Sequence, residues 1–333
     1  MTINDIKKYN EKRNDAYLKD EDNEAWLLRL NTVLKREEEA EYADALTQEH
    51  PLVFIMGVPR SGTTLLTQLI AHNTGLGFIN NFMARFWLAP VTGIRFSNIL
   101  LNDNSSTKYE SNYASTDVMS DIHEFGYFWR QLLQKDTMQK IVNSKELESS
   151  LDWTYIEKVL LNIMKEFNSG WVAKNILAAY HAEKFTGIFD KIIFINIERD
   201  LLDNCISILQ ARRKYYKDLN LWWSYVPLEY DQLKDLNYME QIAGQVYYLN
   251  KFYREKAANI GNAKAMTVNY EHLCHHPNEI LTQLKAKLKN EFGYDLKIQE
   301  LDRAFNFRTY SGFEKEKEEF QQHLNYWRSL DTS

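Results

Sequence analysis

Residues 51–70, PLVFIMGVPRSGTTLLTQLI, constrain the fold of this chain more than any other segment. The run LVFIM is typical of a buried strand, and LLTQLI is typical of a helix. Between them, Gly57 and Gly62 have the spacing of the motif G-x-x-x-x-G-K-[ST], but Thr63 replaces the lysine and Arg60 supplies a cation three residues earlier. A strand, a glycine-containing loop and a helix in this order point backbone N–H groups and the helix dipole at one place. The segment therefore predicts an anion site in an α/β fold.

The side chains of the loop support a phosphate ligand. Ser61, Thr63 and Thr64 add hydroxyl donors, Arg60 adds a fixed charge, and Pro59 stiffens the loop. Kinases and ATPases use the loop lysine to reach the β- and γ-phosphates, and a carboxylate helps to hold Mg²⁺. Thr63 cannot supply that charge, and no strand ends in a convincing Mg²⁺ carboxylate. The sequence thus favours phosphate chemistry without a metal ion.

Further strands alternate with helices along the chain. Strands are expected at 170–175, 191–198 and 263–270, with helices at 123–135, 151–167 and 239–260 among others. This alternation predicts a P-loop-like, three-layer α/β fold, in which helices flank a parallel sheet. Residues 1–48 are expected to form a helical N-terminal extension, and 49–333 a single α/β domain. We expect 74–118 to be irregular, with a polar loop near 102–116, and the charged tail beyond Arg308 to be partly loose.

Composition excludes several classes of protein. The net charge of −6 gives no global basic field, so nucleic acid is not expected as a partner, and an anionic ligand must meet a local positive patch. Two cysteines, Cys205 and Cys274, do not make a disulfide framework and fit a reducing compartment. No apolar run is long enough for a transmembrane segment, and the N-terminus does not resemble a secretory signal. The expected location is cytoplasmic.

Two separated motifs resemble one enzyme family. GVPRSGTTL is similar to the 5′-phosphosulfate loop of sulfotransferases that use 3′-phosphoadenosine 5′-phosphosulfate (PAPS), above all to the PRSGTT form in protein-tyrosine sulfotransferases and many bacterial members. KIIFINIERDLLDNCIS provides a strand, then Arg199, then Ser207 eight residues later, which resembles the family's 3′-phosphate motif. Lys174, in WVAKN, matches a strand-end lysine of the family, although Ile176 replaces the usual proline. The resemblance covers roughly residues 50–280.

The resemblance implies a role for each of these residues. The family moves a sulfonate from PAPS to an acceptor oxygen by in-line displacement, leaving adenosine 3′,5′-bisphosphate (PAP), and cations stabilise the charge on the bridging oxygen. Arg60 is the first choice for that cation and Lys174 the second. The 3′-phosphate would be held by Arg199 and Ser207, with Arg212 and Arg213 as additional candidates. The 5′-phosphate would be held by the loop, through Gly57, Pro59, Arg60, Ser61, Gly62, Thr63 and Thr64.

The general base is the least defined part of the site. Tyrosine-specific relatives use a glutamate soon after the loop helix, but this chain has Asn80 and Asn81 there, and an amide cannot accept the proton. His123 and Glu124 are the replacement candidates, because histidine titrates near neutrality and a carboxylate needs only proximity. Both residues also suit a purely structural role at a helix start. His72 and the group His272, Cys274, His275 and His276 are interpreted as structural, and no metal site is expected.

The leading hypothesis is therefore a sulfotransferase acting on a hydroxyl-bearing acceptor, which is a saccharide, glycolipid or small molecule. Abundant aromatic residues, including 20 Tyr and 8 Trp, favour a saccharide or glycolipid. Two alternatives stay open at this point: a P-loop nucleotide kinase or NTPase, and a non-catalytic protein that binds phosphoadenosine. Formation of a homodimer is also left open.

Overall fold

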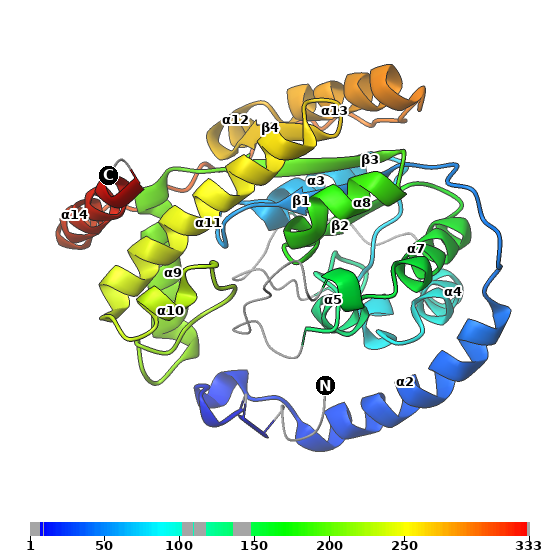
Figure 1. Ribbon diagram of the computed structural model, residues 1–333, viewed down its shortest axis with the longest axis horizontal. Coiled ribbons are helices and arrows are strands. Elements are labelled where there is room, and N and C mark those ends of the chain that lie inside the picture. The colour runs from blue at the N-terminus through cyan, green and yellow to red at the C-terminus, as the bar shows by residue number, and fades with distance from the viewer. Residues whose placement is uncertain (1–6, 9, 102–108, 110–117, 136–147, 332–333) are drawn as a thin grey trace.

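The computed structural model describes residues 7–8, 10–101, 109, 118–135 and 148–331. Figure 1 shows helices on both sides of a central sheet, with helix α2 along one edge of the molecule and helix α14 at the opposite edge. The elements, in chain order, are η1 (Asp15–Tyr17), α2 (Glu21–Glu41), β1 (Leu52–Met56), α3 (Thr63–Asn73), η2 (Met83–Arg85), α4 (Pro90–Leu100), α5 (Gly126–Leu132), α7 (Trp153–Phe167), β2 (Trp171–Lys174), η3 (Ala178–His181), α8 (Ala182–Ile188), β3 (Ile192–Glu198), α9 (Leu201–Tyr215), α10 (Tyr230–Leu233), α11 (Tyr238–Ile260), β4 (Ala265–Asn269), α12 (Tyr270–His275), α13 (Pro277–Phe292) and α14 (Glu314–Asp331).

The sheet has the strand order β2-β1-β3-β4, and all three pairings are parallel. Strand β1 is central, and its Leu52 is opposite Trp171 of β2 on one side and Ile192 of β3 on the other. The chain moves outward from β1 to β2 and then crosses back over β1 to β3. Loops at such a reversal of direction diverge and leave a crevice beyond the carboxyl ends of the strands. The loop after β1 is at that crevice, and the predicted parallel α/β fold is confirmed.

Each face of the sheet contributes to a separate core. Along β1, Leu52, Phe54 and Met56 pack into one core, and Val53 and Ile55 pack into the other. This alternation follows from the two-residue period of a strand, and both faces are apolar because helices cover both. The first core is covered by helices that include α7, α8, α9 and α11, and the second by α3, α12 and α13.

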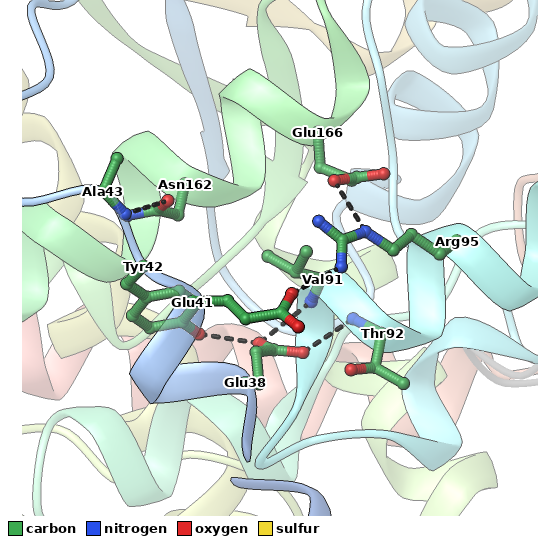
Figure 2. Close-up of polar contacts among 9 residues, drawn as sticks. All are labelled: Glu38, Glu41, Tyr42, Ala43, Val91, Thr92, Arg95, Asn162 and Glu166. Carbon is green, nitrogen blue, oxygen red and sulfur yellow. Dashed lines mark hydrogen bonds and ion pairs between the residues drawn. The ribbon is translucent and has the colours of Figure 1, made fainter. Parts of the chain in front are cut away.

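Polar contacts, shown in Figure 2, hold helix α2 against the rest of the chain, and those of Glu38 are buried. The carboxylate of Glu38 accepts hydrogen bonds from the backbone N–H groups of Val91 (3.1 Å) and Thr92 (2.6 Å), at the start of α4, and from the hydroxyl of Tyr42 (2.7 Å). A carboxylate at a helix N-terminus satisfies free N–H groups and interacts favourably with the helix dipole. The same view shows Arg95 paired with Glu41 and Glu166, and the N–H of Ala43 bonded to Asn162. Helix α2 and the residues that follow it are thus held against α4 and α7 by these contacts.

Three expectations about secondary structure are wrong. Within the segment expected to be irregular, residues 90–100 form α4, which Pro90 begins and Glu38 caps. The tail is not loose, because α14 buries Phe320, Leu324 and Trp327 in the first core. The helix expected over 123–135 spans only Gly126–Leu132. The polar loop expected near 102–116 is, apart from residue 109, outside the described residues.

Candidate functional site

The loop between β1 and α3 depends on its two glycines. Gly57 has φ 153°, and a Cβ there would meet the Ile197 carbonyl oxygen at 2.7 Å. Gly62 has φ 104°, and a Cβ there would meet the Tyr270 ring at 2.4 Å. Only glycine adopts both conformations without strain. The loop can therefore turn sharply and bring its backbone N–H groups toward the N-terminus of α3.

Arg60 connects the loop to the second predicted motif. Its own φ is 73°, a left-handed conformation that is uncommon for a residue with a side chain and that recurs at functional sites. Its Nε donates a hydrogen bond to Ser207 Oγ (3.0 Å), and its carbonyl oxygen accepts one from Arg199 (3.1 Å). Ser207 is fully buried on α9. The structure therefore brings Arg60 together with Arg199 and Ser207, although the two motifs are about 140 residues apart in the chain.

The guanidinium of Arg199 lies under the tail of the chain. It is 4.6 Å from the ring centroid of Tyr270 and 5.6 Å from that of Tyr310, it donates to the carbonyl oxygen of Arg308, and Asp203 is 3.7 Å away. Its Nε is buried without a hydrogen-bond partner. A buried guanidinium N–H with no acceptor suits a site for an anionic oxygen. The sequence argument missed the segment around Arg308 and Tyr310, which carries no pattern that predicts this contact.

Lys174 lies on the other side of the loop, at the end of β2. It ends β2, beside the loop after β1, and its side chain is 3% exposed. Its Nζ donates a hydrogen bond to Thr64 Oγ1 (2.9 Å), in the first turn of α3, and also contacts Glu124 Oε1. The Glu124 side chain is 38% exposed. We call Thr64, Lys174 and Glu124 the transfer cluster. In this cluster the buried ammonium of Lys174 contacts both the first turn of α3 and a carboxylate that solvent can reach.

His123 is adjacent to the transfer cluster but differs from Glu124 chemically. Its Nδ1 accepts a hydrogen bond from the backbone N–H of Phe125 (2.8 Å), so that nitrogen carries no proton, and in the neutral ring the proton is on Nε2. Although part of His123 is exposed to solvent, protein atoms surround most of its ring. The resulting desolvation of the charged form lowers the His123 pKa to about 4. His123 is therefore neutral near pH 7, with its basic nitrogen already engaged.

A cavity of about 10 Å³ adjoins these residues. His123, Glu124 and Lys174 contribute its polar lining. Its apolar lining includes Phe78 and the stacked indoles of Trp129 and Trp171, whose ring centroids are 5.5 Å apart. The carboxylate of Glu124 is thus at a boundary between the polar crevice and an aromatic surface.

Comparison with known proteins identifies the family. A sequence model described as the sulfotransferase family matches residues 51–293, which is more than half of the chain. The chain belongs to the sulfotransferase family. It is a sulfotransferase enzyme by that membership, and the kinase and non-catalytic alternatives are not retained. No curated protein matches the sequence significantly.

A solved sulfotransferase structure shares the fold. Sulfotransferase STF9 from Mycobacterium avium aligns with a TM-score of 0.50 at 15% identity, over 91% of this chain and 85% of that chain. Sulfotransferase STF1 from Mycobacterium tuberculosis H37Rv aligns with a TM-score of 0.47 at 14% identity, over 92% of this chain and 80% of that chain. At this identity, the likeness to the first structure shows the fold and nothing about the acceptor.

Two further predicted residues of this sulfotransferase have other partners in the structure. Arg212 is fully buried and donates to the Leu219 carbonyl oxygen (3.0 Å) and to Gln241 (2.8 Å), and burial lowers its pKa to about 10. Arg213 pairs with Glu316 of α14 (3.3 Å). These contacts do not bring Arg212 or Arg213 to Arg199 and Ser207.

Polar residues in and after the loop helix have structural partners. Asn80 donates to Ser97 (2.9 Å) and accepts from the backbone N–H of Met83 (2.8 Å). His72 is 3.1 Å from Asp121, a buried carboxylate that the sequence argument did not single out.

Among the described residues, no helix is both long and apolar enough to cross a bilayer, and no three potential ligands are grouped for a metal ion.

Proposed function

We propose that this sulfotransferase transfers the sulfonate of PAPS to a hydroxyl group of a saccharide or glycolipid, with Lys174 as the principal cation and Glu124 as the general base. The transfer cluster carries this proposal. One buried ammonium contacts both the first turn of the loop helix and a partly exposed carboxylate. An anion bound at the loop and an acceptor hydroxyl near Glu124 would then meet at Lys174.

The residues of the crevice fit the two ends of the donor. At the loop, Ser61 Oγ is buried without a partner, and Thr63 and Thr64 are buried at the positive end of α3. An orphaned hydroxyl beside backbone N–H groups suits phosphate oxygens. At the other end, Arg199 and Ser207 would hold the 3′-phosphate. PAPS supplies an activated sulfonate, joined to the 5′-phosphate through an anhydride oxygen.

Lys174 would stabilise the charge that develops on the bridging oxygen. Its ammonium is fixed in advance by Thr64 and Glu124, and it is almost fully shielded from water. A cation fixed in a site of low polarity stabilises a developing charge without reorganising during the reaction. Arg60, which the sequence ranks first, has its Nε directed at Ser207 instead, so we assign it to binding of the donor.

Glu124 would remove the proton of the acceptor hydroxyl. Its carboxylate contacts Lys174, and partial exposure leaves it accessible to an acceptor. His123 is the poorer candidate, because its Nδ1 is occupied by the Phe125 N–H and its pKa is about 4. Phe125 has φ 54°, so backbone strain is located directly after the proposed base.

A transfer assay tests this function. The protein is incubated with PAPS and a mixture of mono- and oligosaccharides, with and without a chelator, and sulfonated products are identified by mass spectrometry. We expect a product, and equal release of adenosine 3′,5′-bisphosphate, in both conditions. Parallel assays use glycolipid and phenol pools, and a sulfonated product from the phenol pool alone would overturn the assignment of the acceptor class.

A further inference from the structure

Asp121 is a buried carboxylate that joins the loop helix to the segment carrying the proposed base. It is 6% exposed and lies three residues before Glu124 in the chain. Its Oδ2 accepts a hydrogen bond from Gln68 Nε2 (2.9 Å), and its Oδ1 is 3.1 Å from His72 Nε2. Oδ1 also accepts from the backbone N–H of Ile122 (2.7 Å). Three nitrogen atoms thus surround one carboxylate, which is the arrangement that makes burial of such a group tolerable.

Gln68 and His72 lie on the face of α3 that also carries Thr64. The three residues are four positions apart, and side chains with this spacing lie one above the other on a helix. Thr64, in the first turn, accepts a hydrogen bond from Lys174 Nζ (2.9 Å) in the transfer cluster. Asp121 contacts the same face one and two turns later. One helix therefore connects the anion loop, the cation and the buried carboxylate.

These contacts close into a ring. Two residues separate Asp121 from Glu124 along the chain, and the Glu124 carboxylate contacts Lys174. Lys174 contacts Thr64, and α3 leads from Thr64 back to Asp121 through Gln68. In a closed ring each contact limits the movement of the others, and a reacting group is held in place by the hydrogen bonds of its neighbours. The buried contacts of Asp121 therefore help to fix Glu124 relative to the loop.

Backbone pairing holds the same segment on another side. The N–H of Asn81 donates to the Asp121 carbonyl oxygen (2.9 Å), and the N–H of His123 donates to the Ile79 carbonyl oxygen (2.8 Å). Glu124 lies beyond this pairing, in the irregular stretch before α5. The backbone bonds set the course of the segment, and the side chain of Asp121 adds its connection to α3. Loss of that side chain should leave a paired segment in which Glu124 has more freedom.

We propose that Asp121 is a positioning residue, which holds Glu124 at the place relative to the anion loop that sulfonate transfer requires. It acts through Glu124 and does not itself take part in the reaction. A misplacement of about 1 Å in a reacting group lowers the rate by about 100-fold, so loss of Asp121 should lower kcat more than affinity for the donor. This inference rests on the proposed function, because it explains how the proposed base is held.

Two substitutions of Asp121 test this role. Asp121→Ala removes all three contacts, whereas Asp121→Asn keeps an oxygen for Ile122 and His72. Transfer from PAPS is measured at steady state, and binding of adenosine 3′,5′-bisphosphate by calorimetry counts the folded sites. We expect Asp121→Ala to lower kcat per site about 10- to 100-fold, and affinity for the bisphosphate by less than about 3-fold. Asp121→Asn should lie between Asp121→Ala and the wild type.

Glu38→Ala is the matched control for loss of a buried carboxylate. Glu38 is 5% exposed, and like Asp121 it has three hydrogen-bond partners, on α4 and at Tyr42. The variant should lower the thermal unfolding temperature about as much as Asp121→Ala, but leave kcat per bisphosphate site unchanged. Equal losses of kcat in the two variants would show a general effect of destabilisation and overturn the inference.

Combination with Glu124→Gln shows whether Asp121 acts through the base. In that background, Asp121→Ala should change kcat less than about 3-fold, because the group that it positions is already lost. The same loss of kcat in both backgrounds overturns the inference even when transfer from PAPS is established. If Asp121→Ala does not fold, Asp121→Asn replaces it in this comparison.

A crystal structure of the Asp121 variant separates this inference from the proposed function, because it requires no reaction. A Glu124 carboxylate that still contacts Lys174 overturns the inference. A displaced carboxylate, with the loop at 57–64 unchanged, supports it. If the wild-type protein transfers no sulfonate while the variant shows this displacement, the proposed function fails and the positioning role of Asp121 stands.

Discussion

Replacing Glu124 by Gln gives the sharpest test of the transfer cluster, because it removes a charge and keeps the shape of the side chain. Loss of a general base typically lowers the rate 10²- to 10⁴-fold. The change also leaves the Lys174 ammonium, whose side chain is 3% exposed, with Thr64 as its remaining partner. Removing one partner of a fully buried ion pair costs about 3–5 kcal/mol, but the Glu124 side chain is 38% exposed, so we expect about 1–2 kcal/mol of lost stability.

A double-mutant cycle separates the catalytic effect from the structural one. Lys174→Met removes the buried charge, and in the double variant Glu124→Gln/Lys174→Met no unpaired ammonium remains. Thermal unfolding should therefore show that the double variant recovers part of the stability lost in Glu124→Gln. Steady-state kinetics should show kcat as low as in the single variants, since base and cation act in the same step. Recovery of kcat together with stability would refute the catalytic assignment and leave a structural pair.

His123→Gln is the control for the base, because it replaces the other candidate next to Glu124. Since the His123 pKa is about 4, the ring is neutral above that pH, and the variant should retain most of the wild-type kcat. The folded protein binds this proton less readily than the unfolded chain. Stability should therefore decrease as pH falls from about 6.5 toward 4, and this decrease should be smaller in the variant. A 100-fold loss of kcat in His123→Gln would transfer the role of base to His123.

Three further substitutions test other parts of the account. Gly62→Ala places a Cβ 2.4 Å from the Tyr270 ring at φ 104°, so it should lower the free energy of unfolding by about 1–3 kcal/mol and abolish binding of adenosine 3′,5′-bisphosphate. Gly187→Ala, where a Cβ has free space, should do neither. Unimpaired binding by Gly62→Ala would contradict the loop assignment. Ser207→Ala should weaken the bisphosphate about 10-fold or more and adenosine 5′-monophosphate very little in calorimetry, and equal losses would remove Ser207 from the 3′-phosphate site. Glu38→Gln should lower the free energy of unfolding by about 1–2 kcal/mol, because it weakens the hydrogen bonds at the N-terminus of α4. Glu41→Gln removes only an exposed ion pair and should lie within about 0.5 kcal/mol of wild type. Similar values for both variants would refute the capping role.

The elements that the sequence predicts well are those with strong local signals. β1 and β3 are nearly continuous apolar runs, and Gly57 and Gly62 punctuate the loop, so strand, turn and helix follow from neighbouring residues alone. The parallel order follows from helices placed between strands. The contact between Arg199 and the loop could also be predicted from the sequence, because residues that follow neighbouring parallel strands lie at the same edge of the sheet.

The missed elements depend on contacts between distant segments. α4 is capped by Glu38, which is more than fifty residues earlier in the chain, and no local pattern reports that contact. α14 did have a signal, since Phe320, Leu324 and Trp327 are spaced along one helical face, but the charged run before them obscured it. The choice between His123 and Glu124 depends on one backbone N–H, that of Phe125, whose direction follows from a left-handed conformation that the sequence does not predict.

A crystal structure with adenosine 3′,5′-bisphosphate would test the central claim most directly. The account predicts the 5′-phosphate against the loop at 57–64, within hydrogen-bond distance of Thr64 and beside Lys174, and the 3′-phosphate in contact with Arg199 and Ser207. A bisphosphate bound in the reverse direction, or outside the crevice between β1 and β3, would contradict it.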